Sequence, residues 1–157
     1  MSRTAGDDAT AALRELILAG ERYRMAVATH LDLSINESRA ISHLLARGAM
    51  GQTDLAAVLG LTTSSMTTLL DRLVDREMVR RVPDPTDRRR SSVEISDSGA
   101  RRLRDVRDWM SMVFHPVAAD DLPGVTATLV AVADSLRTVT SEIEASRTPT
   151  PGRRRLH

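Results

Sequence analysis

Residues 83–99 read PDPTDRRRSSVEISDSG, and this segment decides which fold the sequence predicts. Its Asp-Pro step favours a turn, and Val93 and Ile95 have the alternate spacing of a short strand. Together these features predict a β-hairpin over residues 79–96 with concentrated positive charge at its tip. The arginines of this tip are Arg88, Arg89 and Arg90.

The arginine run has two interpretations. Runs of like charge usually form solvated surface, and taken alone this run favours that interpretation. The alternative is insertion into a narrow negative groove, because the DNA minor groove attracts guanidinium groups, which lose water more easily than ammonium groups. The segments that precede the hairpin decide between the two.

Two helical patterns joined by a tight turn lie just before the hairpin, within residues 51–76. The first covers residues 53–59 and ends at Gly60, a typical helix stop. Its expected buried positions are Leu55, Val58 and Leu59. Thr62 can cap the second helix. The apolar positions of that helix follow helical spacing and are Met66, Leu69, Leu70 and Leu73.

The opposite face of the second helix is rich in hydroxyl groups. Short hydroxyl side chains near a helix N-terminus can approach phosphates and base edges, whereas the simpler alternative is that they cap and solubilise the helix. The uninterrupted order of helix, turn, helix and basic hairpin favours a winged helix-turn-helix that binds DNA. The candidate DNA-binding residues of this helix are Thr62, Thr63, Ser64, Ser65, Thr67, Thr68 and Arg72, and those of the hairpin are Arg88, Arg89 and Arg90.

The same segments carry a family resemblance. The shared residues are Leu55-Ala56, Leu59-Gly60-Leu61, Leu70-Asp71-Arg72-Leu73, Asp84-Pro85-Thr86-Asp87-Arg88-Arg89, Val93-Glu94-Ile95-Ser96 and Gly99. On these motifs, of which the hairpin motif is the most specific, residues 8–146 resemble the multiple-antibiotic-resistance regulator (MarR) family of bacterial transcription factors. The chain departs from the family at Glu77, where glycine is usual. A left-handed conformation costs a non-glycine residue about 1 kcal/mol, so we expect this helix to end differently.

The resemblance implies a homodimeric repressor of a nearby operon that binds a pseudo-palindromic double-stranded DNA operator. The second helix would enter the major groove and Arg88 the flanking minor groove. Asp87 would support the wing by a charge-assisted hydrogen bond to a neighbouring arginine. The alternative is a winged helix that binds an acidic protein, as an interaction or antirepressor module without sequence-specific DNA binding.

The family also binds small aromatic or phenolic effectors in a cleft near the dimer base. In this sequence the candidate effector-binding residues are Tyr23, His30, His43, Trp109 and Met112. Trp109 lies off the main apolar seam of its helix, so it forms either core or the wall of a ligand cavity.

The rest of the chain is predicted to be helical, which makes the fold mainly α with a small β wing. Residues 8–31 form a long amphipathic pattern, and a capping box at Ser34 begins a helix that runs to Arg47. Two further helices are expected after the wing, one from near Ser96 with apolar positions as far as Val117, and one from residues 121–123.

Apolar stripes on the terminal helices repeat at alternating spacings of three and four residues. Such stripes form the seam of paired helices, and a small winged domain offers too little surface to cover them. We therefore expect these helices to form a dimerisation base, the alternative being that they pack on one another within one chain. The candidate interface residues are Leu13, Leu16, Ile17, Leu129, Val132, Leu136, Val139 and Ile143.

Composition limits the remaining functions. The chain has 157 residues and no cysteine, which excludes disulfides and thiolate metal sites. The net charge is only +1, and all 22 basic residues are arginine, but eleven of them lie within residues 72–107 and predict a local basic face. No apolar run could cross a membrane and no secretory signal is recognisable, so we expect a cytoplasmic protein.

Neither catalysis nor a metal site is supported by a motif. The sequence contains no nucleophile elbow, phosphate-binding loop, dinucleotide fingerprint or zinc-protease helix. His30, His43 and His115 fall on three separate helices without partners of metal-ligand spacing. We expect no enzyme activity, no metal and no cofactor. The expected organisation is a loose N-terminus at residues 1–7, one domain at residues 8–146, and a flexible basic tail at residues 147–157.

Overall fold

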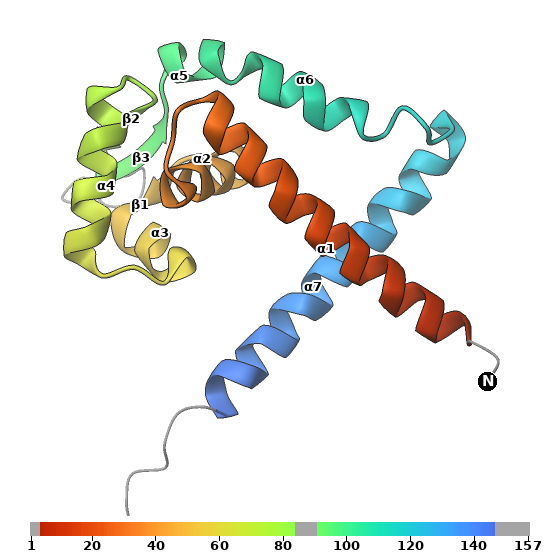
Figure 1. Cartoon of the computed structure of the whole chain (residues 1–157). Helices are drawn as coiled ribbons and strands as arrows, with labels where there is room; N and C mark the ends of the chain where they lie inside the picture. Colours follow the sequence, from red (N-terminus) through yellow and green to blue (C-terminus); the bar gives the residue numbers. More distant parts are fainter. Residues whose placement is uncertain (1–3, 84–90, 147–157) are drawn as a thin grey trace, which may run out of the picture. The chain divides into compact units, whose positions relative to one another are not determined.

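The computed structural model describes residues 4–83 and 91–146 (Figure 1). The chain divides into two compact units, Met1–Trp109 and Met110–His157. The elements of the first unit are α1 (Ala5–His30), α2 (Ile35–Arg47), β1 (Met50–Gly51), α3 (Gln52–Leu59), α4 (Thr63–Asp75), β2 (Val79–Pro83), β3 (Ser91–Ile95), α5 (Asp97–Arg102) and the greater part of α6 (Arg104–Met112). The predicted class, mainly α with a small β wing, is confirmed.

Capping side chains set the starts of the first two helices. The predicted capping box of α2 is present, because the Ser34 hydroxyl accepts from the Glu37 amide and the Glu37 carboxylate accepts from the Ser34 amide. An equivalent box between Thr4 and Asp7 begins α1 at Ala5. The expected start at residue 8 is therefore three residues too late.

The helix-turn-helix forms as predicted. Gly60 ends α3 with a φ of 67°, and the Thr62 hydroxyl accepts from the Ser65 amide at the start of α4. The predicted apolar face of α4 is buried. In α3 the prediction for Val58 is wrong, because Val58 is 37% exposed and Ala56 is buried instead. At about 100° per residue, Ala56 and Val58 lie equally far to either side of Leu55 and Leu59, so helical spacing alone does not distinguish them, and α3 buries the side that carries Ala56.

Glu77 overturns the expectation that α4 ends differently from the family pattern. Glu77 itself adopts the left-handed conformation, with a φ of 55°. Its amide donates to the carbonyl of Val74, and the Met78 amide donates to the carbonyl of Leu73. These two bonds form the Schellman motif that usually places glycine at this position. The helix thus ends in the glycine geometry with a glutamate in it.

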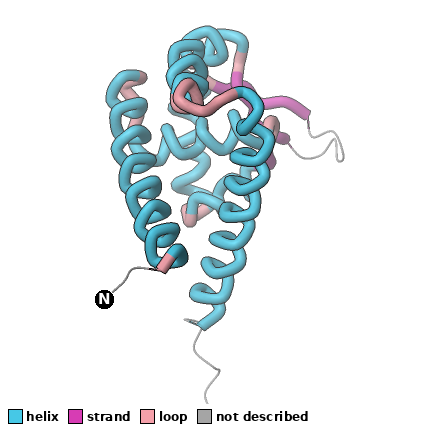
Figure 2. The backbone as a smooth tube through the Cα atoms, turned by 90° about the vertical axis from the view of Figure 1, so that its right-hand side faces the viewer, coloured by secondary structure: helices cyan, strands magenta, loops and turns pink. Residues whose placement is uncertain are grey.

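The sheet has the antiparallel strand order β1-β3-β2, and its three strands are gathered together in Figure 2. The predicted hairpin strands pair from Val79 with Ile95 to Pro83 with Ser91. Residues 84–90, the predicted tip, lie outside the described residues. The short β1 was not predicted, because its two residues form a strand only by pairing with β3.

The core of the first unit lies beneath the helix-turn-helix. It joins side chains from α2, α3, α4 and the sheet to the ends of α1 and α6, and α4 packs against α2, α3 and β2. Its largest fully buried side chains are Leu55, Met66, Leu70, Leu73, Met78, Leu103 and Val93. The first two thirds of α1, by contrast, have no buried residue. The core therefore fixes α4 and leaves the apolar stripe of α1 uncovered within the first unit.

The prediction of one helix from near Ser96 as far as Val117 is wrong in its continuity and in its end. It is interrupted at Leu103 between α5 and α6, and α6 ends at Met112. After Met112 the amides of Phe114 and His115 bond to carbonyls three residues back, which tightens the chain. Pro116 supplies no amide and disfavours helix in the residue before it.

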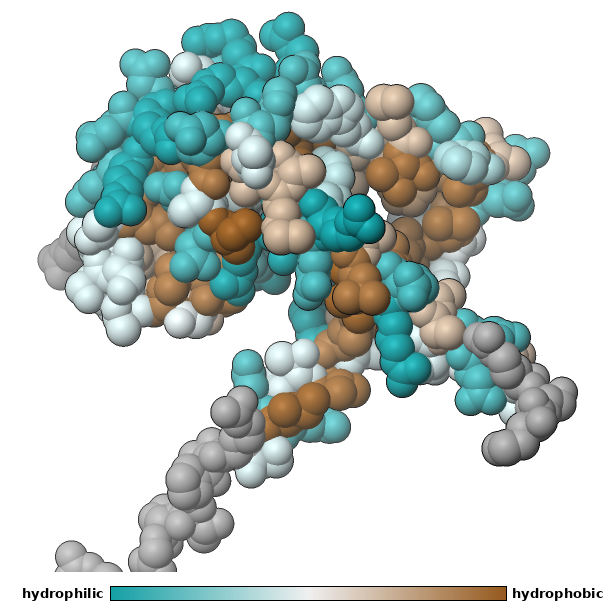
Figure 3. Space-filling model, in the orientation of Figure 1, coloured by the Kyte–Doolittle hydropathy of each residue, from teal (hydrophilic) through white to brown (hydrophobic). Residues whose placement is uncertain are grey.

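The second unit contains the end of α6, a short 3-10 helix η1 (Ala119–Asp121) and α7 (Leu122–Ser146). The start of α7 agrees with the prediction. None of its residues is buried, and Figure 3 shows apolar side chains exposed along it.

Candidate nucleic-acid interface

The exposed face of α4 carries the polar residues that the sequence singled out. Thr62 and all six candidates within α4 are solvent-exposed, whereas Met66, Leu70 and Leu73 on the opposite face are fully buried. A helix held so firmly along one side presents its other side in a fixed orientation. This geometry suits a helix that reads a groove.

The hydroxyl groups on this face are already hydrogen-bonded. Thr67 donates to the carbonyl of Thr63 over 3.0 Å, and Thr68 donates to the carbonyl of Ser64 over 3.2 Å. Thr62 donates to the Ser65 hydroxyl over 2.9 Å. These bonds limit which protons α4 can offer to a partner.

Four side chains that sequence reasoning did not connect form a network across α4, α3 and β2. Arg81 donates to Asp71 over 2.9 Å and to the amide oxygen of Gln52 over 3.2 Å. The amide nitrogen of Gln52 donates to the Thr67 hydroxyl over 2.7 Å. The partners are 10 to 29 residues apart in sequence, so no local pattern signals the network.

The arginines near α4 differ in how far their charge is compensated. Arg80 lies 2.7 Å from Glu94 and 3.9 Å from Asp97, and the hydrogen bond to Glu94 is the main cause that raises the pKa of Arg80. Arg81 is paired with Asp71. Arg72 forms no ion pair with any residue in the described ranges. Its charge is therefore available to an anion such as phosphate.

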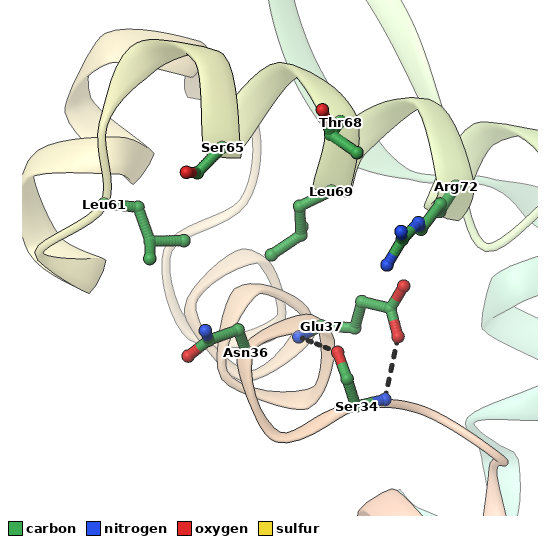
Figure 4. A pocket seen from close by; sticks show the side chains of 8 residues that line it. All are labelled: Ser34, Asn36, Glu37, Leu61, Ser65, Thr68, Leu69 and Arg72. Carbon is green, nitrogen blue, oxygen red and sulfur yellow. Dashed lines mark hydrogen bonds between the residues drawn. The ribbon is translucent and has the colours of Figure 1, made fainter.

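A pocket of about 350 Å³ lies between the start of α2 and the side of α4 (Figure 4). Arg72 and Glu37 point toward one another across it (Figure 4). The lining residues are Ser34, Asn36, Glu37, Leu61, Ser65, Thr68, Leu69 and Arg72. None of the five candidate effector residues belongs to this lining.

The candidates of the wing tip, Arg88, Arg89 and Arg90, lie with Asp87 outside the described residues. The structure describes the base of the hairpin instead. There the Ser96 hydroxyl donates to the carbonyl of Glu77, and the Ser96 amide donates to that of Met78 over 3.1 Å. A Cβ on Gly99 would lie 2.1 Å from the same Met78 oxygen. The hairpin is therefore anchored tightly to the end of α4.

Three of the candidate effector residues lie where α1 meets α6. The Tyr23 hydroxyl donates to the carbonyl of Val106 over 3.2 Å, and burial raises the pKa of Tyr23. The rings of His30 and Trp109 meet edge to face with centroids 4.8 Å apart. His43 is half-buried on α2, apart from these contacts. Met112 belongs to the second unit and is 54% exposed.

The candidate dimer residues are largely uncovered. Leu16 and Ile17 on α1 are 53% and 44% exposed, and Ile143 on α7 is 55% exposed. Leu129, Leu136 and Val139 are also exposed, whereas Leu13 and Val132 are half-buried. Apolar residues exposed in regular rows are typical of surfaces that another chain covers.

The described ranges contain neither a grouping of metal ligands nor a membrane-spanning helix. Within residues 4–83 and 91–146, no three His, Asp or Glu side chains are grouped so that they could hold a metal ion. In the same part of the chain no helix has the length and apolar character needed to span a bilayer.

The comparisons with known proteins agree on the fold. Residues 33–91 match the model of the MarR family, and no curated protein matches the chain. Its fold is similar to a mutant of MepR from a multidrug-resistant S. aureus clinical isolate, with 19% identity, a TM-score of 0.64 and coverage of 87% of this chain and 99% of that one. It is also similar to the structure of Rv1404 from Mycobacterium tuberculosis, with 23% identity, a TM-score of 0.58 and coverage of 85% of this chain and 95% of that one. The S. aureus MepR–DNA complex has 18% identity to this chain and a TM-score of 0.50, and the match covers 80% of this chain and 98% of that one.

Proposed function

Because residues 33–91 match the model of the MarR family, we propose that the protein belongs to this family and is a DNA-binding transcriptional regulator with α4 as its recognition helix. The observation that supports this most directly is the exposed polar face of α4 above a fully buried apolar face. A helix of this kind enters the major groove in helix-turn-helix proteins. MepR, a protein of similar fold, has been solved in complex with DNA.

The contacts divide into those that position the protein and those that read sequence. Arg72 on α4 forms no ion pair within the described ranges, although it points toward Glu37, and it contacts phosphate. Thr67 and Thr68, with the hydroxyls near the start of the helix, face base edges. Arg88 enters the flanking minor groove with Arg89 and Arg90 beside it, and Asp87 supports the wing.

The DNA site is a pseudo-palindrome bound by a homodimer. Two copies related by a twofold axis present their recognition helices on one face of the duplex, so the half-sites lie about one helical turn, roughly 10 bp, apart. The exposed apolar rows on α1 and α7 support a second chain as their cover. The protein acts in the cytoplasm and has no catalytic role.

Repression is relieved by a small aromatic or phenolic effector. A ligand that prefers the DNA-incompetent arrangement by ~3 kcal/mol weakens operator binding up to about a hundredfold. The proposed site includes the contact of His30 with Trp109, together with Tyr23 and His43. Screening phenols and aromatic acids for quenching of Trp109 fluorescence and for release of DNA tests this proposal. Ligands whose affinity is unchanged by substitution of Tyr23, His43 and Trp109 would place the site elsewhere.

Selection of bound sequences from a random DNA library tests the central proposal. We expect an enriched inverted repeat with the half-site spacing given above. Retention on DNA that is independent of sequence, or no retention, would favour the alternative of a winged helix that binds an acidic protein.

The wing assignment is tested by titrating salt. Arg88→Ala should weaken binding to all sequences and reduce the dependence of affinity on salt by about one counterion for each lost phosphate contact. Arg22→Ala, on the exposed surface of α1, is the matched control and should bind as the parent does. Equal affinity of the Arg88 variant and the parent at the same salt would show that the wing assignment is wrong.

A further inference from the structure

In the hydrogen-bond network that crosses α4, α3 and β2, the chemistry of the side chains determines which group donates and which accepts in each bond. An ionised carboxylate only accepts hydrogen bonds and a guanidinium only donates them. Arg81 therefore presents N–H groups both to Asp71 and to Gln52. The amide oxygen of Gln52 must face Arg81, so its NH2 group must face Thr67. The Thr67 hydroxyl is consequently an acceptor in this bond.

The one proton of the Thr67 hydroxyl is also committed. It is donated to the carbonyl of Thr63, one turn earlier in α4, over 3.0 Å. A hydroxyl has one proton and two lone pairs. With the proton on Thr63 and one lone pair on Gln52, Thr67 retains a single lone pair. Toward any molecule on the exposed face of α4, Thr67 is therefore an acceptor and not a donor.

This polarity determines which bases Thr67 can bind in the major groove. Adenine and cytosine present amino groups there, at N6 and N4, whereas guanine O6 and N7 and thymine O4 are acceptors. We propose that Gln52 is a specificity-determining positioning residue, which holds Thr67 as an acceptor and so selects adenine or cytosine at one position of each half-site. The inference rests on the proposed function of α4 as a recognition helix.

Thr68 provides an internal comparison on the same helix. Its hydroxyl also donates to a backbone carbonyl, that of Ser64, over 3.2 Å. It receives no hydrogen bond from a side chain in the described part of the chain. Without Gln52, the Thr67 hydroxyl would be held by its carbonyl bond alone, as the Thr68 hydroxyl is, and could rotate to donate to a base; Thr68 itself would be unaffected.

The experiment compares base preference across a small set of variants. The parent, Gln52→Ala, Thr67→Val, Thr68→Val and the double variant Gln52→Ala/Thr67→Val are each passed through random-library selection. Each is then titrated against the selected operator and its single-base changes. Thr67→Val keeps the β-branch and a γ-methyl group but has neither a hydroxyl proton nor a lone pair.

We expect the parent to prefer adenine or cytosine over guanine or thymine at one position of each half-site by about fivefold, the size of one hydrogen bond. Gln52→Ala and Thr67→Val should each lose this preference while the other positions keep theirs. The double variant should lose no more than either single variant, since both act through one hydroxyl. Thr68→Val should retain the preference at the Thr67 position.

Other outcomes separate this inference from the proposed function. If Gln52→Ala weakens binding equally to all sequences, or keeps the parental motif, the positioning role of Gln52 is wrong. The proposed function as a DNA-binding regulator is not contradicted by that result. If the parent selects no motif, the proposed function fails and the inference fails with it. Should Gln52→Ala not fold, Gln52→Glu serves instead, because its carboxylate still accepts from Arg81 but cannot donate to Thr67.

Discussion

Glu77 shows how one residue can be held in a conformation that its own type disfavours. Its φ of 55° satisfies the last carbonyls of α4 through the amides of Glu77 and Met78. Glu77→Gly should raise the free energy of unfolding by up to about 1 kcal/mol, because glycine has no steric cost in the left-handed region. Urea denaturation measures this change.

A second left-handed residue supplies the control. Asp32 has a φ of 53°, but its carboxylate also lies 2.8 Å from Arg76. Asp32→Gly relieves the backbone and removes this ion pair, so it should stabilise the fold less than Glu77→Gly does. A Glu77→Gly variant less stable than the parent would show that the side chain of Glu77 contributes more than its backbone costs.

His43 predicts a dependence of stability on acid. Burial, followed by the charges of Arg47, Arg39 and Arg24, lowers the pKa of His43. A histidine with a depressed folded-state pKa binds protons more readily when unfolded, so the fold is penalised as pH falls below the unfolded value of about 6.5. His43→Gln should therefore lose less stability than the parent between about pH 7 and pH 5. A difference between the two proteins that does not change with pH would contradict this account.

At the scale of elements, the features that the sequence predicted correctly are those set by neighbours in the chain. Ser34 with Glu37, Thr62, and the stop at Gly60 each act within one helical turn, so their patterns can be read locally. The capping box of Thr4 and Asp7 has the same signature and could have been found.

The missed features depend on distant partners. Met50 and Gly51 form a strand only because β3 lies beside them, and the network of Gln52 joins residues from three elements. The same is true of the candidate interface. The hydroxyl-rich face of α4 was predictable, whereas the hydrogen bond from Gln52 to Thr67 joins residues 15 apart in the sequence and has no local pattern.

Packing between α5 and the start of β2 predicts a strongly destabilising substitution. A methyl group on Gly99 would meet the backbone of Met78 at 2.1 to 3.1 Å, where no flexible side chain can yield. Gly99→Ala should therefore lower the free energy of unfolding by about 1–3 kcal/mol or more. Gly20→Ala, whose Cβ would meet nothing within 4 Å, is the control and should stabilise α1 by up to about 1 kcal/mol. Thermal denaturation of both variants measures these changes. Equal melting temperatures for the two variants would contradict the expected clash between a methyl group at position 99 and the backbone of Met78.

At the scale of the whole molecule, the proposed dimer predicts that the folded protein is scarce as a monomer. Leu136 on α7 is 40% exposed in the single chain. If a second chain covers it, Leu136→Asp should weaken association by several kcal/mol, because a charge would be buried without a partner. Ser141→Asp, exposed on the side of α7 opposite the apolar row, is the matched control. Sedimentation at micromolar concentration tests both, and a single folded species of 17.2 kDa for the parent would contradict the dimer.

The anchored base of the hairpin has a mechanical consequence. Ser96 is hydrogen-bonded to the carbonyls of Glu77 and Met78, and Gly99 lies against Met78. The hairpin is therefore fixed at the end nearest α4, where β2 begins and β3 ends. A hairpin attached in this way can bend along its strands but is restrained from pivoting where it joins α4. We therefore expect these contacts to hold the angle between α4 and the first pairs of β2 and β3. On this account, adaptation to grooves of different width or spacing comes from bending of the strands farther from α4.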